Sequence, residues 1–282
     1  MRMGARIAAV CLLAFTSWSV FAAVPAAQTY YFLVFNAPAA GQEEAYNRWY
    51  DTQHAPDVVS IPGFVSAQRF VYNEGVQLRE VALKKPKYLV IYKIVTPDLP
   101  AVIAEVKRRL QSGETRVSDA LDRNSGQMYI YRAFRPEVRG AGGDVPGAPA
   151  GPKQKYFQVV FGNAVAGKDA EFNTWYDQDH APNMVAAKGF VWARRAIINE
   201  VQMEPIPDAP RYLALFDIET NDLPAVLKQP GKGTEPPPAF DREHTYGYTY
   251  RAIGPELSGD AVRAERARAK AQSKTQSGIK SP

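Results

Sequence analysis

The 282-residue sequence is poor in the side chains that thiol and metal chemistry need. It has one cysteine, Cys11, and three histidines, His54, His180 and His244. Cys11 lies in an N-terminal apolar run, so a cysteine nucleophile and a Cys-ligated zinc site are excluded from the rest of the chain. Because the histidines are far apart in the sequence, we expect no metal site. The sequence also lacks a P-loop, a G-x-S-x-G turn and a dinucleotide fingerprint after a strand.

No apolar run is long enough for a transmembrane helix. Arg2 and Arg6 precede the apolar run from 7 to 20, and the small residues Ala22 and Ala23 follow it. A membrane-spanning helix needs roughly 20 apolar residues, and this run has about 14. The layout is typical of a cleaved secretory signal over residues 1–23, which predicts a periplasmic or secreted protein without a stable membrane anchor.

The formal net charge of +5 comes largely from the two ends of the chain. Residues 258–282 are basic and rich in Ala, Ser and Gln, and we expect a solvated, disordered tail there. Between the ends, no basic stripe alternates with aromatic residues. Nucleic acid is therefore not an expected partner.

The dominant feature is an internal duplication. The phrase WYDTQHAP at 49–56 recurs as WYDQDHAP at 175–182, so the offset is 126 residues. The same offset relates Gly63-Phe64-Val65 to Gly189-Phe190-Val191 and Arg69 to Arg195. The chain therefore contains two homologous units, which we place at 28–137 and 155–257 with a Gly/Pro/Ala-rich linker at 138–154.

Each unit has the pattern strand, helix, strand, strand, helix, strand. In the first unit we expect strands at 30–36, 64–72, 88–95 and 127–134, and helices that begin near Gly41 and at Asp98. This βαββαβ order predicts an α+β, ferredoxin-like sheet covered by helices on one face. Two such sheets in one chain can cover each other, so we expect an intramolecular pseudo-dimeric α+β barrel; further oligomerisation stays open.

Both units resemble the dimeric α+β barrel superfamily, and its EthD-like members most. The resemblance rests on the WYD phrase, on His54-Ala55-Pro56-Asp57 and on Pro62-Gly63-Phe64. It implies a pocket for a small, often aromatic molecule between the sheet and the helices of each half. The superfamily includes cofactor-independent monooxygenases, isomerases, cyclases and lyases as well as haem-dependent branches, so the fold does not select a reaction.

His54 is the candidate general acid or base. On a helical path Asp51 lies three residues earlier, and Asp57 follows three residues later, so either carboxylate could orient the imidazole. The alternative is that His54 and Asp51 cap the helix. In the second unit Asn183 replaces Asp57 and Lys188 replaces Pro62, which favours the first unit as the active one and a structural role for His180.

Aromatic and cationic side chains are the candidate substrate-binding groups. They are Trp49, Tyr50, Arg69, Tyr88 and Tyr131 in the first unit, and Tyr176, His180 and Arg195 in the second. Tyrosines offer ring contact and a hydroxyl donor, and an arginine on an apolar strand face can bind a carboxylate or phenolate. The alternatives are that Trp49 and Trp175 are core residues and that the arginines pair with a helix carboxylate or extend to solvent.

These observations predict an exported enzyme that works without a cofactor on a small aromatic or cyclic substrate. We expect isomerase, lyase or cyclase chemistry, or monooxygenase-type chemistry, with His54, Asp51 and Asp57 as catalytic residues. The alternative is a non-catalytic periplasmic binding protein for a hydrophobic ligand or for haem, which needs only one axial histidine.

Overall fold

The computed structural model describes residues 25–77, 87–229, 233 and 235–278. The predicted signal segment at 1–23 and its Cys11 lie outside the described residues. Within the described ranges no helix is long and apolar enough to span a membrane. The same ranges contain no group of three or more His, Cys, Asp or Glu side chains placed to hold a metal ion.

The predicted element order is confirmed in both units. The first unit contains β1 (Gln28–Asn36), α1 (Glu43–Trp49), a π-helix (Tyr50–His54), α2 (Ala55–Val59), β2 (Phe64–Tyr72), β3 (Tyr88–Thr96), α3 (Leu99–Ser112) and β4 (Gln127–Ala133). The second unit contains β6 (Gln154–Gly162), α4 (Asp169–Trp175), a π-helix (Tyr176–His180), α5 (Ala181–Val185), β7 (Phe190–Ile198), β8 (Tyr212–Thr220), α6 (Leu223–Leu227) and β9 (Tyr246–Ser258).

The two sheets close into one barrel. Within each unit the strand order is fourth, first, third, second, as in a ferredoxin-like sheet. Antiparallel pairing of β2 with β9 joins one pair of sheet edges, and pairing of β4 with β7 joins the other. Because every edge of the eight strands is paired, the barrel leaves no open strand edge between the halves. The expected pseudo-dimeric α+β barrel is therefore the observed fold.

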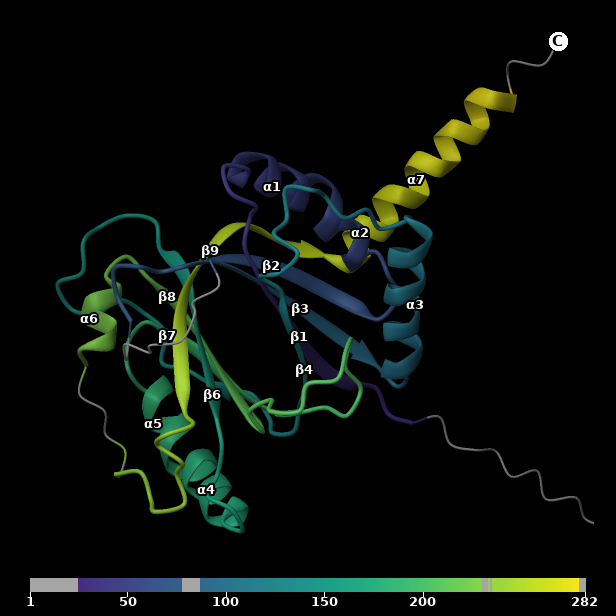
Figure 1. The fold of residues 1–282 in the computed structure, drawn as a ribbon. Coiled ribbons are helices and arrows are strands. Elements are labelled where there is room, and N and C mark those ends of the chain that lie inside the picture. The colour runs from purple at the N-terminus through teal and green to yellow at the C-terminus, as the bar shows by residue number, and fades with distance from the viewer. Residues whose placement is uncertain (1–24, 78–86, 230–232, 234, 279–282) are drawn as a thin grey trace, which may run out of the picture.

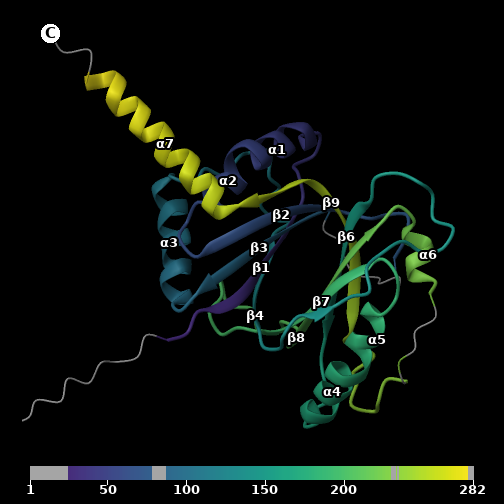
Figure 2. The ribbon, with the colours of Figure 1, turned by 180° about the vertical axis from the view of Figure 1, so that it is seen from behind.

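Alternation along the strands separates three cores. Residues on one face of the strands, such as Leu33, Phe70 and Phe161, fill the barrel interior. Residues on the opposite face of the first sheet pack against α1, α2 and α3, and those of the second sheet pack against α4, α5 and α6. Figures 1 and 2 show the helices outside the barrel, beside the strands of their own unit. Each unit thus has its own sheet–helix layer, which is where the resemblance to the dimeric α+β barrel superfamily implies a pocket.

Glycine fixes the chain where β2 approaches α3. Gly63 has φ +95, and a Cβ at this position would lie 2.9 Å from Val102 Cγ2. Gly189 repeats this geometry with φ +91 against Val226. Only glycine adopts such a φ without strain and also permits this approach. The duplicated Gly-Phe-Val sequence therefore sets how closely the second helix of each unit packs on its sheet.

Two predicted boundaries need correction. The linker contains a short strand, β5 (Val138–Arg139), which pairs with β7. The basic tail is not disordered over 259–278 but forms the helix α7 (Gly259–Gly278). Its Ala, Arg, Lys, Glu and Gln residues are strong helix formers, and Arg263 donates to the main-chain carbonyls of Val59, Ile61 and Phe64. The start of α7 is thus held against the end of α2, and the rest of it projects from the body (Figure 1).

The helices of the two units differ most at α3 and α6. α3 runs for 14 residues and buries a stripe of Leu99, Val102, Ile103 and Val106. α6 runs for 5 residues before the Pro- and Gly-rich sequence that follows. The first unit therefore has a longer cover over its sheet than the second.

Candidate functional site

The duplicated phrase forms a π-helical turn between two short α-helices in each unit. Pro56 lacks an N–H, so it cannot donate to the carbonyl four residues earlier, and the ladder widens over Tyr50–His54. Pro182 has the same effect on Tyr176–His180. Single π-turns inside α-helices are frequent at functional sites. In this protein the turn places both histidines at the same point of their units, facing the sheet–helix layer.

His54 lies in an aromatic cluster. Its ring centroid is 4.6 Å from that of Trp49 at an interplanar angle of 35°, and 4.9 Å from that of Tyr50 at 76°. Its Nδ1 is buried and has no hydrogen-bond partner. Buried polar atoms almost always have a partner, so an unpaired imidazole nitrogen points to a ligand or a catalytic role.

A main-chain carbonyl lies beside the imidazole in place of a carboxylate. The Arg116 carbonyl accepts a hydrogen bond from Trp49 Nε1 at 3.2 Å, and its hydrogen bonding to His54 raises the pKa of that histidine. Burial acts more strongly in the opposite direction and lowers the pKa of His54 to about 4. The imidazole is therefore neutral at pH 7 and can accept a proton.

Asp51 does not contact the imidazole as expected, because it pairs with Arg69. Arg69 donates to Asp51 and, at 2.7 Å, to Asn47 Oδ1. Its guanidinium lies 4.7 Å from the ring centroid of Tyr50, and the residue is 5% exposed. The charge on a buried guanidinium needs such partners, which accounts for the pairing. The alternative that Arg69 pairs with a helix carboxylate is therefore the observed one.

Asp57 also has another partner. Its Oδ1 accepts from Arg266 of α7 at 2.5 Å, although its charge still raises the pKa of His54. The helix-cap alternative for His54 and Asp51 finds no support either, since neither residue makes a capping hydrogen bond. Asp51 and Asp57 are therefore both paired with arginines, only the charge of Asp57 acts on His54, and the predicted catalytic role of the two carboxylates stays a prediction.

Two of the predicted tyrosines, Tyr88 and Tyr131, lie on opposite faces of the first sheet. Tyr88 is on the helix-facing side, where its hydroxyl bonds to Glu43 at 2.5 Å and Asn47 at 3.1 Å. Tyr131 is fully buried in the barrel interior and donates to the Pro210 carbonyl at 2.7 Å. Tyr131 therefore does not join Tyr88 and His54 in one site, because the sheet separates them.

A buried polar network beside His54 was missed by the sequence analysis. Tyr46 donates to Asn36 Oδ1 at 2.5 Å, and Asn36 Nδ2 lies 3.5 Å from the Tyr50 hydroxyl. Burial raises the pKa of the Tyr50 and Tyr92 hydroxyls, and the buried Tyr92 hydroxyl has no hydrogen-bond partner. These hydroxyls stay protonated and are donors at neutral pH. A residue-by-residue alignment of the two units would have revealed this network, because the second unit lacks the counterparts of Tyr46, Asn36 and Tyr92.

The second unit keeps the histidine but loses this network. His180 stacks on Trp175 with centroids 4.7 Å apart, and burial lowers its pKa to about 4. Arg195 repeats the pairing of Arg69, with Asp177 and with Asn173 at 2.8 Å. Its guanidinium lies 4.3 Å from the Tyr176 ring, and Tyr176 is buried.

Residue changes make the second layer less polar. In place of Tyr46, Asn36 and Tyr92 it has Phe172, Gly162 and Phe216. The buried Trp175 Nε1 has no hydrogen-bond partner, whereas its counterpart Trp49 donates to Arg116. Among the described residues of the second unit, Phe240 lies 5.6 Å from Trp175 between ring centroids. The first unit therefore has the more complete set of acid–base groups.

The second unit also covers part of the first. Residues Val201 and Met203, from the loop between β7 and β8, pack against the sheet–helix core of the first unit. Gln202 fixes this loop, because it accepts from Ile130 N and donates to Ile130 O, both at 2.8 Å. Gln77 makes the reciprocal pair with Thr249 of β9 at 2.7 and 3.0 Å. Each unit therefore uses one loop to cover the other.

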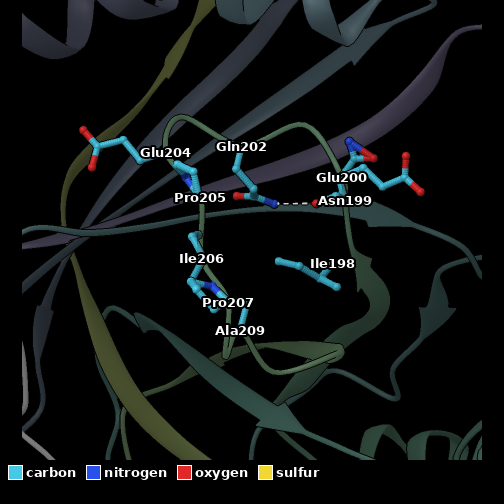
Figure 3. Close-up of a pocket in the computed structure, with 9 residues that line it drawn as sticks. All are labelled: Ile198, Asn199, Glu200, Gln202, Glu204, Pro205, Ile206, Pro207 and Ala209. Carbon is cyan, nitrogen blue, oxygen red and sulfur yellow. Dashed lines mark hydrogen bonds between the residues drawn. The ribbon is translucent and has the colours of Figure 1, made fainter.

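The same loop encloses a surface cavity of about 500 Å³. Figure 3 shows the lining side chains of Ile198, Asn199, Glu200, Gln202, Glu204, Pro205, Ile206, Pro207 and Ala209. The carboxylates of Glu200 and Glu204 point outward, away from one another (Figure 3). Because no polar groups converge there, this cavity does not have the character of a ligand site.

Comparison with known proteins supports the fold. No protein-family model matches the sequence, and no curated protein matches it either. The structure is similar to that of an anthrone oxidase-like protein, with a TM-score of 0.51 and 10% identity over 82% of this chain and 93% of that one. It is also similar to a candidate monooxygenase from Fusobacterium nucleatum subsp. nucleatum ATCC 25586, with a TM-score of 0.52 and 9% identity over 83% and 95% of the chains.

The protein therefore has the dimeric α+β barrel fold, closed here within a single chain. At 9–10% identity this likeness establishes the architecture and leaves the chemistry to be argued from the site.

Proposed function

We propose that the protein is an enzyme that removes a proton from a carbon atom of a small aromatic substrate, with His54 as the general base. The observation that carries this proposal is the neutral imidazole whose buried Nδ1 has no partner. A general base must be deprotonated at the working pH and within reach of the proton that it takes. The sheet–helix layer of the first unit is the proposed binding region.

The buried tyrosines supply the complementary acid groups. A carbon acid next to a carbonyl becomes an enolate or phenolate when it loses its proton, and this oxygen needs hydrogen-bond donors. Tyr50 and Tyr92 lie in the same layer as His54, and burial raises the pKa of both hydroxyls. Opposite displacement of the pKa of a base and of neighbouring acids is a common property of acid–base sites.

Oxygenation without a cofactor is the reaction that we favour over isomerisation or lysis, because the structural neighbours are described as an anthrone oxidase-like protein and a candidate monooxygenase. Anthrone is the trial substrate. Loss of its ring-methylene proton to His54 gives a phenolate that reduces O₂, and anthrone plus O₂ yields anthraquinone plus water. The aromatic rings of Trp49, Tyr50 and Tyr92 suit a flat polycyclic molecule.

The test compares the oxidation of anthrone by wild-type protein and by His54→Ala and His180→Ala, followed by the absorbance of anthraquinone. We expect His54→Ala to lose at least about 100-fold in rate, the usual contribution of a general base, and His180→Ala to retain most of it. The rate should stay constant from pH 8 to 5 and fall as pH approaches 4, because His54 must be neutral.

A wild-type rate in His54→Ala would refute the assignment of the base. No rate above that of buffer in the folded wild-type protein would refute the anthrone-type substrate. Native mass spectrometry of protein purified from its own host then identifies the molecule bound in the layer. Non-catalytic binding, the alternative function, predicts a retained ligand whose binding is unaffected by His54→Ala.

No feature favours haem over an organic substrate. The rings of His54 and His180 each lie against a tryptophan ring and a tyrosine ring. We also propose that the protein acts outside the cytoplasm, on the basis of the signal-like sequence at 1–23. Cell fractionation with N-terminal sequencing of the mature protein tests this, and an intact Met1 would contradict it.

A further inference from the structure

A second cavity lies at one end of the barrel interior, on the opposite side of the sheets from the two histidines. Its volume is about 190 Å³. Side chains from β1, β2, β3, β6, β7 and β9 line it, so both units contribute. Drug-sized sites occupy roughly 300–1,000 Å³, so this cavity is suited to a smaller molecule.

The floor of the cavity is aromatic. Phe157 lies 4.9 Å from Phe70 and 5.2 Å from Trp192 between ring centroids, and the second contact is edge-to-face at 80°. Tyr31 and Ile91 complete the apolar wall. These rings offer a surface to an aromatic group of a ligand.

A carboxylate without its full set of partners lies beside this floor. Asp217 is opposite Phe157 on β6 and opposite Trp192 on β7, and both of these residues line the cavity. Leu213 and Leu215 face the barrel interior, so alternation along β8 directs Asp217 to the same side. Asp217 is 2% exposed and its Oδ1 has no hydrogen-bond partner.

Lys155 satisfies only one oxygen of this carboxylate, at 3.2 Å from Oδ2. Burial outweighs this contact and raises the pKa of Asp217 to about 6. The fold does not require the pair, because the corresponding positions of the first unit are Lys93 and Thr29. Asp217 is thus a costly buried charge with no counterpart in the other half, which points to a ligand.

Charged groups of both signs surround the opening. Lys93 and Lys155 line the cavity together with Glu256 and Glu137. Glu137 is already paired with Arg194 at 3.0 Å and Arg139 at 2.9 Å. A cationic group of a ligand would meet Glu256 in the cavity lining and would reach Asp217 between Phe157 and Trp192, and an anionic group would meet Lys93.

From this arrangement we propose that the barrel cavity binds a small zwitterionic aromatic molecule of the α-amino acid type. Its ring packs on Phe157 and Trp192, its ammonium group donates to Asp217 Oδ1, and its carboxylate pairs with Lys93. A molecule with both charges can pair with Asp217 and with Lys93, whereas a singly charged molecule leaves one of these two residues without a ligand partner. This site is independent of the proposed reaction at His54.

Isothermal titration calorimetry with three matched probes tests the proposal. L-Phenylalanine carries both charges, 2-phenylethylamine lacks the carboxylate, and 3-phenylpropionate lacks the amine. We expect phenylalanine to bind at least ten-fold more tightly than either analogue. Asp217→Asn should weaken phenylalanine and phenylethylamine by at least ten-fold and leave phenylpropionate unchanged.

Lys93→Gln should give the converse pattern and weaken the two carboxylates but not phenylethylamine. Lys107→Gln on the exposed side of α3 is the matched control and should change none of the three affinities. His54→Ala should also leave them unchanged, since the sheet separates the two sites. No heat of binding with millimolar phenylalanine, or an equal affinity in Asp217→Asn, would overturn the proposal.

Discussion

Acidification should destabilise this protein through two partly buried histidines, His54 and His180. In the folded protein burial lowers the pKa of His54 and of His180 from 6.5 to about 4. Between these values the unfolded chain binds a proton at each position and the folded chain does not. The stability that the neutral rings contribute is therefore complete above pH 6.5 and is lost as the pH falls from 6.5 toward 4.

The expected loss is about 2 kcal/mol for each histidine between pH 7.5 and pH 5. Asp217 acts in the opposite direction, because burial raises its pKa from 3.8 to about 6. As the pH falls, the folded state binds a proton at Asp217 that the unfolded state lacks, and this stabilises the folded state by about 1 kcal/mol over the same pH interval. A net loss of about 3 kcal/mol is a large share of the stability of a typical domain.

The assay is urea unfolding at pH 7.5 and pH 5, followed by tryptophan fluorescence. His54→Gln cannot take up a proton, so its free energy of unfolding should fall by about 2 kcal/mol less than that of the wild type over this pH interval. His180→Gln should behave in the same way. His244→Gln is the matched control, because His244 is 68% exposed and pairs with Asp241 at 2.8 Å. The same loss in wild type and His54→Gln would refute the reasoning.

Two further predictions concern the backbone and the C-terminal helix. Gly63→Ala should lower the free energy of unfolding by about 1 kcal/mol or more in addition to the loss that Gly113→Ala causes. Both glycines have positive φ, but only at Gly63 would the added Cβ lie 2.9 Å from Val102. Equal thermal midpoints of the two variants would contradict this. Arg263→Ala removes one donor from each of three carbonyls, of which Ile61 O keeps its bond from Phe64 N, and it should cost about 1.5–3 kcal/mol. The exposed Arg268→Ala should cost under about 0.5 kcal/mol, and equal urea midpoints of the two variants would show that α7 is not docked.

The duplication produced two layers with one shared frame and different chemistry. Both units keep the π-turn, the tryptophan–histidine stack and the buried arginine with its aspartate. Only the first has the Tyr46–Asn36–Tyr50 hydrogen bonds. A frame retained in both halves is explained by packing, whereas the polar groups restricted to the first half support its catalytic role.

Local pattern was sufficient for the architecture. Period-two alternation in stretches such as 88–95, the apolar stripe that begins at Leu99 and the repeated Gly-Phe-Val each specify local structure through backbone geometry. The disorder predicted for the tail at 258–282 is wrong over 259–278, because high net charge suggested disorder while the helix propensity of its alanines and arginines favoured a helix. The three carbonyls that receive Arg263 come from a segment about 200 residues away and leave no local signal.

The sequence was sufficient to predict His54 as a site residue, but it was not sufficient to predict which side chains and carbonyls surround it. His54 was evident because histidine is rare in this chain and the phrase that contains it is duplicated. Sequence distance favoured Asp51 as its neighbour, but the strand that brings Arg69 under the helix draws the carboxylate to a buried guanidinium instead. The carbonyl of Arg116, which bonds to Trp49, belongs to a segment 67 positions away from it.

The sequence by itself determined the two units, their element order and the closed two-sheet barrel, because alternation, helical periodicity and turn glycines act over a few residues. The tertiary structure alone decided which charges meet and which polar atoms stay unpaired. It separated Tyr131 from His54 by a sheet, paired Asp51 with Arg69 and left Asp217 beside the barrel cavity. Such pairings depend on distances between strands of different units, and these distances are set only when the barrel closes.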